Sequence, residues 1–269
     1  MRLFLAGTES RHNTVIDAIL GNGGVSDCKK KRKMQIYLAG QNGKNKILCN
    51  YFLPEYGHGE NGGYDNTVLK YRPYILESFY YADEITKKLI PYFGDFLLDS
   101  GAFTFMQGKS GSIDWEEYID RYADFINETD TKKFFELDID SIVGYDKVLQ
   151  YRRTLEAKTG KQCIPVWHKS RGKEEFIRMC KEYPYVALGG IAIAKGAKDE
   201  FDSKYFPWFI KTAHEYGAKI HCLGYTNMEG IKKYHFDSVD STSWTAGNRF
   251  GFIYKFDGNT MQKNTKQRS

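Results

Sequence analysis

The sequence KKFFELD at residues 132–138 is a short apolar run with polar flanks, and two further segments follow it. Residues 145–159 form an amphipathic segment, and residues 162–167 form a second apolar run. A strand, a helix and a strand in this order indicate a parallel β-sheet, because a parallel connection needs about a dozen residues or more. This unit therefore predicts an α/β fold.

The same alternation continues on both sides of this unit. It predicts further helices over 82–92, 114–128, 173–182, 204–216 and 227–233, and strands over 95–99, 185–189, 218–223 and 236–240. The helix over 114–128 has the clearest signals, because Asp114 is a typical N-cap and Glu116 and Glu117 stand in the first turn.

Two short apolar runs that end in glycine, at 2–7 and 35–40, add two more strands. Eight strands with helical crossovers favour a TIM-like (β/α)8 barrel over an open doubly wound sheet, which stays the alternative. We expect residues 1–269 to form a single barrel domain with irregular N-terminal loops. A glycine-rich stretch predicts a long loop at about 54–76, and the end of the chain predicts a basic tail at about 257–269.

Composition narrows the class of protein. Hydrophobic residues make up 41% and charged residues 27%, which is ordinary for a globular domain and not for a disordered chain. No stretch approaches the ~18 to 20 apolar residues of a membrane span, and the apolar start is too short for a signal peptide. We therefore expect a soluble cytoplasmic protein without membrane contact. The net charge of +5, from 39 basic and 34 acidic residues, permits nucleic-acid binding without requiring it.

The five cysteines predict neither a zinc site nor a redox motif. They are scattered along the chain, and no two have the close spacing of half a zinc site: Cys28, Cys49, Cys163, Cys180 and Cys222. We expect reduced thiols, no metal and no cofactor.

Polar residues follow most of the predicted strands, and in barrels the reacting groups gather at these carboxyl ends. Aspartates dominate: Asp99, Asp138 with Asp140, and Asp237 with Asp240. Three converging carboxylates would supply a nucleophile, a general acid/base and a group that reads hydrogen-bond donors on a substrate. Aspartates at strand ends also cap helices and form turns, so a purely structural role stays open for each.

Four motifs carry a resemblance to a known family. They are Asp99-Ser-Gly-Ala-Phe103, Ala187-Leu-Gly-Gly-Ile-Ala192, Cys222-Leu-Gly-Tyr225 and Phe236-Asp-Ser-Val-Asp-Ser241. In order and spacing they resemble the signature of the tRNA-guanine transglycosylase superfamily, over roughly residues 94–250. The short chain is most similar to the DpdA-type enzymes of phages and bacteria, which place 7-deazaguanines in DNA.

The resemblance implies a base exchange on a nucleic acid. An aspartate attacks C1′ of a guanosine, guanine leaves, and a 7-deazaguanine such as 7-cyano-7-deazaguanine attacks the covalent intermediate. Asp240 matches the nucleophile, and Asp237 takes that role if the register slips by three residues. Asp99 matches the general acid/base.

The resemblance also implies how the base is held. Phe103 matches an aromatic that stacks on the base, and Asp138 matches the carboxylate that accepts from the guanine edge, with Asp140 as the competing assignment. Gly189 and Gly190 match backbone donors to the base carbonyl. Ser100 and Asp237 complete the expected substrate-binding set.

Two departures from the family bear on the substrate. His168 stands where the tRNA enzymes carry a glutamine. Three roles are open for it: a contact to the base, a contact to a phosphate, or a structural histidine at the rim. The zinc subdomain of the tRNA enzymes has no counterpart, so we expect DNA rather than tRNA. Candidate phosphate contacts are Lys169, Arg171 and Arg249, each equally readable as a solvated charge.

Other functions stay open on this sequence. The first is the queuine-type tRNA enzyme, with the same chemistry on another polymer. A small nucleoside or glycoside transferase and a nucleic-acid-binding barrel without turnover are weaker alternatives. The sequence is compatible with accessory proteins and with self-association.

Overall fold

The protein is described by a computed structural model that covers residues 34–40, 72–106, 113–190, 198–225, 227–242, 252–256 and 261–265. The predicted strand at 2–7, the loop residues 54–71, and Arg249 lie outside these ranges. Within them, one sheet has seven parallel strands in the order β3-β2-β1-β7-β6-β5-β4. Its strands are β1 (Gln35–Ala39), β2 (Tyr74–Ser78), β3 (Asp95–Asp99), β4 (Val166–Trp167), β5 (Tyr185–Leu188), β6 (Lys219–Cys222) and β7 (Ser238–Ser241).

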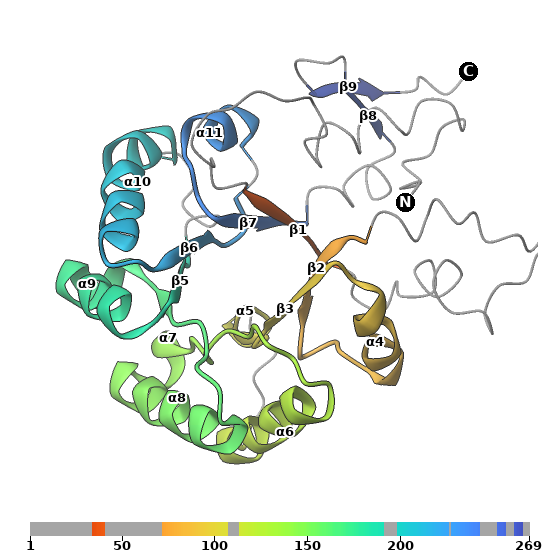
Figure 1. Ribbon diagram of the computed structural model, residues 1–269, viewed down its shortest axis with the longest axis vertical. Helices are drawn as coiled ribbons and strands as arrows, with labels where there is room; N and C mark the ends of the chain where they lie inside the picture. Colours follow the sequence, from red (N-terminus) through yellow and green to blue (C-terminus); the bar gives the residue numbers. More distant parts are fainter. Residues whose placement is uncertain are drawn as a thin grey trace, which may run out of the picture.

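Helices lie around the outside of the curved sheet (Figure 1). They are α4 (Glu84–Leu89), α6 (Trp115–Glu128), α8 (Tyr145–Thr159), α9 (Gly172–Glu182), α10 (Lys198–Glu215) and α11 (Met228–Lys233). Short helical turns follow several strands: η3 (Ile90–Tyr92), α5 (Ala102–Thr104), α7 (Asp140–Val143) and η5 (Lys169–Arg171). The predicted alternation of strand and helix is confirmed for these elements, and the fold is an α/β fold with a parallel, barrel-like sheet.

Local signals in the sequence placed α6, α8 and α9 accurately and misplaced the start of α10. Asp114 caps α6 as predicted, because its Oδ1 accepts a 3.0 Å hydrogen bond from the Glu117 amide. α8 spans 145–159, and α9 spans 172–182, within one residue of the expectation. α10 begins at Lys198, six residues before the predicted start.

The predicted strand over 132–138 is the main departure. Only Phe134 and Phe135 pair, through single parallel bridges to Leu98 and Ile164, which connect the segment to both edges of the seven-stranded sheet. Beyond them the ladder stops, because the side chain of Glu136, and not a backbone carbonyl, accepts the Val166 amide hydrogen at 2.7 Å. The sheet of the described residues is therefore a barrel-like arc without strand-length pairing at this position.

Two predicted irregular segments contain strands. β2 occupies 74–78 and overlaps the end of the predicted 54–76 loop. Its apolar run is short and follows a glycine-rich stretch, so the sequence did not reveal it. In the predicted tail, β9 (Met261–Thr265) pairs antiparallel with β8 (Phe252–Phe256). The sequence of β9, MQKNT, lacks the apolar alternation that identifies a strand.

The core has an inner and an outer layer because successive strand residues face opposite sides of a sheet. The inner cluster contains side chains from five strands and from the 134–135 segment, which meet across the concave face: Tyr37, Ala39, Leu76, Leu97, Phe135, Ile164, Val166 and Ala187. The alternating residues Leu98, Val186, Ile220 and Val239 pack outward against the helices. This alternation directs Asp99 and Asp240 to the concave side. No helix in the described ranges has the length and apolarity to cross a membrane.

Candidate active site

Three carboxylates meet at the carboxyl edge of the sheet. Asp99 ends β3, Asp240 lies in β7, and Asp138 follows the bridged 134–135 segment. Burial, and to a lesser extent the charges of Asp138 and Asp240, raise the pKa of Asp99 to about 7. A bond from the Gly101 amide, 3.0 Å from Oδ2 of Asp99, opposes this shift. The predicted convergence of Asp99, Asp138 and Asp240 is therefore present in the structure.

The turn after β3 depends on the backbone conformation of Gly101, whose amide bonds the Asp99 carboxylate. Gly101 has φ +86°, and a Cβ placed there would lie 2.8 Å from Cβ of Tyr80 and 2.9 Å from the Tyr118 hydroxyl. A side chain at this position would collide with both neighbours and strain the backbone. Only glycine therefore allows the Gly101 amide to turn back to the Asp99 carboxylate.

Replacing Asp99 by Asn should stabilise the protein above neutral pH. A folded-state pKa raised from the unfolded value means that the protonated form is favoured in the folded protein, so its stabilising contribution is present at low pH and is lost as the pH rises through about 7. Asn removes the ionisation. The unfolded chain ionises at the ordinary pKa of 3.8, so part of this contribution is already lost at pH 5. We expect the gain in unfolding free energy of Asp99→Asn over wild type to be larger at pH 8 than at pH 5.

Urea titrations at the two pH values measure this difference, with Asp124→Asn as the control because Asp124 is an exposed aspartate on α6. A variant that gains nothing between pH 5 and pH 8 would show that Asp99 ionises like an ordinary carboxyl group.

Asp138 is buried and bonded on both oxygens. Oδ2 is 2.8 Å from Nε2 of His168, and Oδ1 is 3.4 Å from the Ser100 hydroxyl. Burial raises the pKa of Asp138, while the bond from His168 lowers it. Since an ionised carboxylate only accepts, Nε2 of His168 carries the hydrogen and its Nδ1 faces Gly190. His168 thus orients the carboxylate that is expected to read the base.

The two glycines after β5, Gly189 and Gly190, differ in whether the backbone amide already donates a hydrogen bond. Gly189 is expected to donate to a base, but its amide already donates to the Trp167 carbonyl at 2.8 Å, as part of the sheet ladder. That expectation is corrected. A Cβ at Gly189 would lie 2.6 Å from Cε1 of His168, so this glycine makes room for the imidazole. Gly190 is exposed, and its amide has no hydrogen-bond partner among the described residues.

Asp240 is 6% exposed and is held by two donors on the same oxygen. Oδ1 lies 2.8 Å from the Gly224 amide and 3.1 Å from Nε2 of His221. Within the described residues both hydrogen bonds of Asp240 go to Oδ1, and Oδ2 accepts none. Gly224 and His221 were not among the expected site residues, and only the period-two alternation of β6 would have placed His221 on the concave face.

Asp237 lies at the other end of the strand. It precedes β7 at the amino edge, where Oδ2 accepts hydrogen bonds of 2.9 Å from the Ile220 amide and from Nε2 of His214. The three-residue spacing therefore separates Asp237 from the carboxyl edge, and the geometry places Asp240 and not Asp237 beside Asp99.

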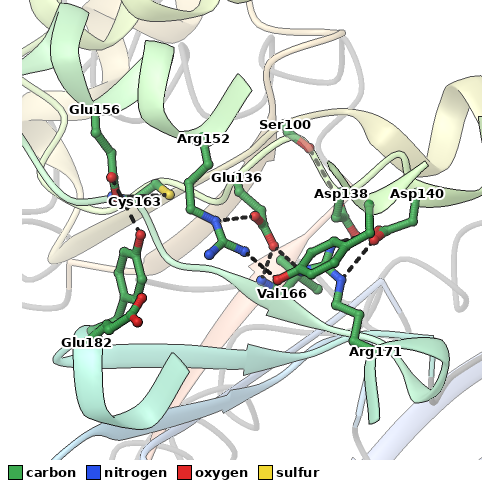
Figure 2. Close-up of polar contacts among 12 residues, drawn as sticks. Ser100, Glu136, Asp138, Asp140, Arg152, Glu156, Cys163, Val166, Arg171 and Glu182 are labelled. Carbon is green, nitrogen blue, oxygen red and sulfur yellow. Dashed lines mark hydrogen bonds and ion pairs between the residues drawn. The ribbon is translucent and has the colours of Figure 1, made fainter. Parts of the chain in front are cut away.

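Arg171 and Asp140 form a buried ion network with Glu136 and Arg152 (Figure 2). The Arg171 guanidinium bonds both oxygens of Asp140, at 2.9 and 2.6 Å, and Oε1 of Glu136 at 2.6 Å. The side chain of Arg171 is 1% exposed, so the predicted phosphate contact is wrong. Both oxygens of Asp140 accept hydrogen bonds from the Arg171 guanidinium, whereas those of Asp138 contact His168 and Ser100. Lys169 is exposed.

Phe103 projects from the turn after β3. It lies in α5, is 52% exposed, and follows Asp99 by four residues. An exposed aromatic ring in the turn that follows Asp99 is available to stack on a planar ligand. Ser100, by contrast, is fully buried and contacts Asp138, so it supports that carboxylate.

No group of three or more histidine, cysteine or acidic side chains in the described part of the chain is placed to hold a metal ion. No family model and no curated protein sequence matches the chain. Among solved structures it is similar to "QR15, an Aldolase", with a TM-score of 0.46 and 10% identity over 80% of this chain and 91% of that one. It is also similar to the carboxyl transferase domain of Rhizobium etli pyruvate carboxylase with 3-hydroxypyruvate, with a TM-score of 0.38 and 11% identity over 78% of this chain and 33% of that one.

Proposed function

We propose that the protein is a nucleic-acid guanine transglycosylase that exchanges guanine for a 7-deazaguanine. The observation that carries this proposal is the meeting of Asp99, Asp138 and Asp240 at one edge, with the pKa of Asp99 raised to about 7. A group with this pKa both donates and accepts a proton at neutral pH, as two successive base transfers require. The motif resemblance supplies the reaction class.

The exchange has two balanced steps. In the first, Oδ2 of Asp240 attacks C1′ of the target guanosine, and the electron pair of the broken C1′–N9 bond leaves with guanine, which takes a proton from Asp99. In the second, the incoming 7-deazaguanine loses its N9 proton to Asp99, and N9 attacks C1′ as the bond to Asp240 breaks. Two inversions retain the configuration at C1′.

Asp138 reads the base in this proposal. A carboxylate accepts two parallel donors, as the N1–H and 2-amino group of guanine present them, and adenine lacks that pair. His168 keeps the Asp138 oxygens oriented through its 2.8 Å bond. Phe103 stacks on the base, and the Gly190 amide is the remaining backbone donor for its carbonyl oxygen.

We further propose that the sheet is a complete (β/α)8 barrel in which Phe134 and Phe135 stand for one strand. The single bridges from these residues to Leu98 of β3 and Ile164 beside β4 support it. In such barrels the carboxyl edge is the catalytic face, which is where the three carboxylates lie.

DNA is the proposed polymer and the cytoplasm the proposed location. The target nucleotide has to leave the duplex to reach carboxylates at a barrel edge. Lys169, exposed beside His168, is the proposed phosphate contact among the described residues. The queuine-type reaction on tRNA is the competing proposal, and the same experiment separates the two.

Nucleoside mass spectrometry tests the proposal. Purified protein is incubated with 7-cyano-7-deazaguanine and either single-stranded DNA, duplex DNA or tRNA, and the digested nucleosides are analysed. A 7-deazaguanine deoxynucleoside is the expected product, and the modified base in tRNA alone would support the competing reaction. Free guanine without incorporation would indicate a hydrolase, and no change in any of the three substrates would overturn base exchange.

A further inference from the structure

A chain of hydrogen bonds leads from Asp240 along the concave face of the sheet. Nε2 of His221 on β6 is 3.1 Å from Oδ1 of Asp240, and Nδ1 of the same ring is 2.5 Å from Oγ of Ser238 on β7. Oγ of Ser238 is in turn hydrogen-bonded to the Tyr185 hydroxyl on β5. His221 and Ser238 are fully buried.

The hydrogens of this chain have one consistent direction. The Asp240 carboxylate only accepts, so Nε2 of His221 carries a hydrogen. In the neutral ring Nδ1 then accepts, and it takes the Ser238 hydroxyl hydrogen. Oγ of Ser238 is left to accept from the Tyr185 hydroxyl. Each group donates toward Asp240, and each donor has one acceptor.

The polar groups of this hydrogen-bond chain lie in apolar surroundings, where burying them costs free energy. His221 lies among aromatic rings, with centroids 5.4 Å from Phe135 and 6.1 Å from Tyr37. A polar group buried in such surroundings costs free energy unless its hydrogen bonds are satisfied, and apolar residues of similar size would fill the space without that cost. What the buried imidazole supplies here is an N–H donor to Oδ1 of Asp240.

We propose that His221 is a positioning residue for Asp240, with its tautomer set by the Asp240 carboxylate and its Nδ1 held by the Ser238 hydroxyl. This inference rests on the proposed function. The His221 and Gly224 donors on Oδ1 fix the plane of the carboxylate, so that Oδ2 is presented to C1′. In the covalent intermediate Oδ1 is the ester carbonyl oxygen, and the same two donors stabilise the negative charge that returns to it when the bond to C1′ breaks.

The tautomer is measurable without any substrate. Long-range ¹H–¹⁵N spectra of protein with ¹⁵N-labelled histidine distinguish Nε2–H from Nδ1–H rings, and the His221→Gln variant assigns the signal among the six histidines. We expect the Nε2–H form in wild type, and an altered tautomer distribution in Asp240→Asn, because the side-chain amide of Asn can donate as well as accept. An Nδ1–H ring in wild type would overturn the proposal.

The kinetic consequence is measured on the covalent adduct. An oligonucleotide that contains the target guanosine is mixed with protein in the absence of incoming base, and the adduct is followed on denaturing gels. For His221→Leu we expect the rate constant of adduct formation at saturating oligonucleotide to fall roughly 10- to 100-fold, with unchanged oligonucleotide affinity. Partial recovery in His221→Gln, which keeps an N–H donor, distinguishes positioning from packing.

His214→Gln is the matched control, because His214 makes the equivalent 2.9 Å bond to Asp237 at the opposite end of β7. It should react like wild type. Thermal unfolding of each variant checks folding, and Ser238→Ala replaces His221→Leu if the latter does not fold. Equal adduct rates in wild type and a folded His221→Leu would overturn this inference alone. No adduct in wild type would instead overturn the proposed function, while the tautomer result would still stand.

Discussion

Asp240→Asn should abolish base exchange while leaving the fold intact. Asn keeps an oxygen for the Gly224 amide, which lies 2.8 Å from Oδ1 in the native protein, but its amide is too weak a nucleophile to form a bond to C1′. We expect the rate of 7-deazaguanine incorporation to fall by a factor on the order of 10⁴ or more. The measurement is the initial rate of incorporation by nucleoside mass spectrometry, together with the loss of the covalent adduct.

The matched control lies three residues away on the same strand. Asp237→Asn keeps the acceptor for the Ile220 amide and should retain most of the exchange activity, because Asp237 lies at the amino edge of the sheet. If Asp237→Asn eliminated the adduct and Asp240→Asn did not, the nucleophile assignment would be reversed.

Among the substitutions proposed, Glu136→Leu should lower the free energy of unfolding most. Glu136 is fully buried, its Oε2 accepts from Nε of Arg152 at 2.7 Å, and its Oε1 accepts from Arg171 and from the Val166 amide. Leucine would leave the buried Arg152 without this carboxylate and the Val166 amide without its acceptor. Removing one partner of a buried ion pair costs about 3–5 kcal/mol of unfolding free energy.

Urea unfolding measures this loss of free energy. A second variant at Glu136 and a surface control show which contacts account for it. Glu136→Gln retains an oxygen for the Val166 amide and should lose less than the leucine variant. Asp120→Asn breaks the exposed Asp120–Lys158 pair, at 3.1 Å, and should change the unfolding free energy by less than about 0.5 kcal/mol. A leucine variant as stable as Asp120→Asn would show that the network around Glu136 does not support the fold.

Local sequence signals were enough for most elements of the fold. β3 at 95–99 and α8 at 145–159 coincide with the predicted ranges, because an apolar run between turns and a periodic amphipathic segment are properties of neighbouring residues. β2 was missed, since its apolar run is short and follows a glycine-rich stretch. The shortened pairing at 134–135 could not be foreseen either, because it depends on where the Glu136 side chain lies relative to Val166, 30 positions later.

The sequence alone determined that aspartates would gather at one edge, because parallel strands place their carboxyl ends together and Asp99, Asp138 and Asp240 each follow or end a strand segment. It could not separate Lys169 from Arg171, two cations in one turn, of which the fold exposes the first and buries the second against Asp140 and Glu136. Nor could it show that His221 meets Asp240, 19 positions away. Strand periodicity and chain order are local properties, whereas ion pairs and burial depend on residues brought together by folding, so the direction and partners of each polar side chain were decided only by the tertiary structure.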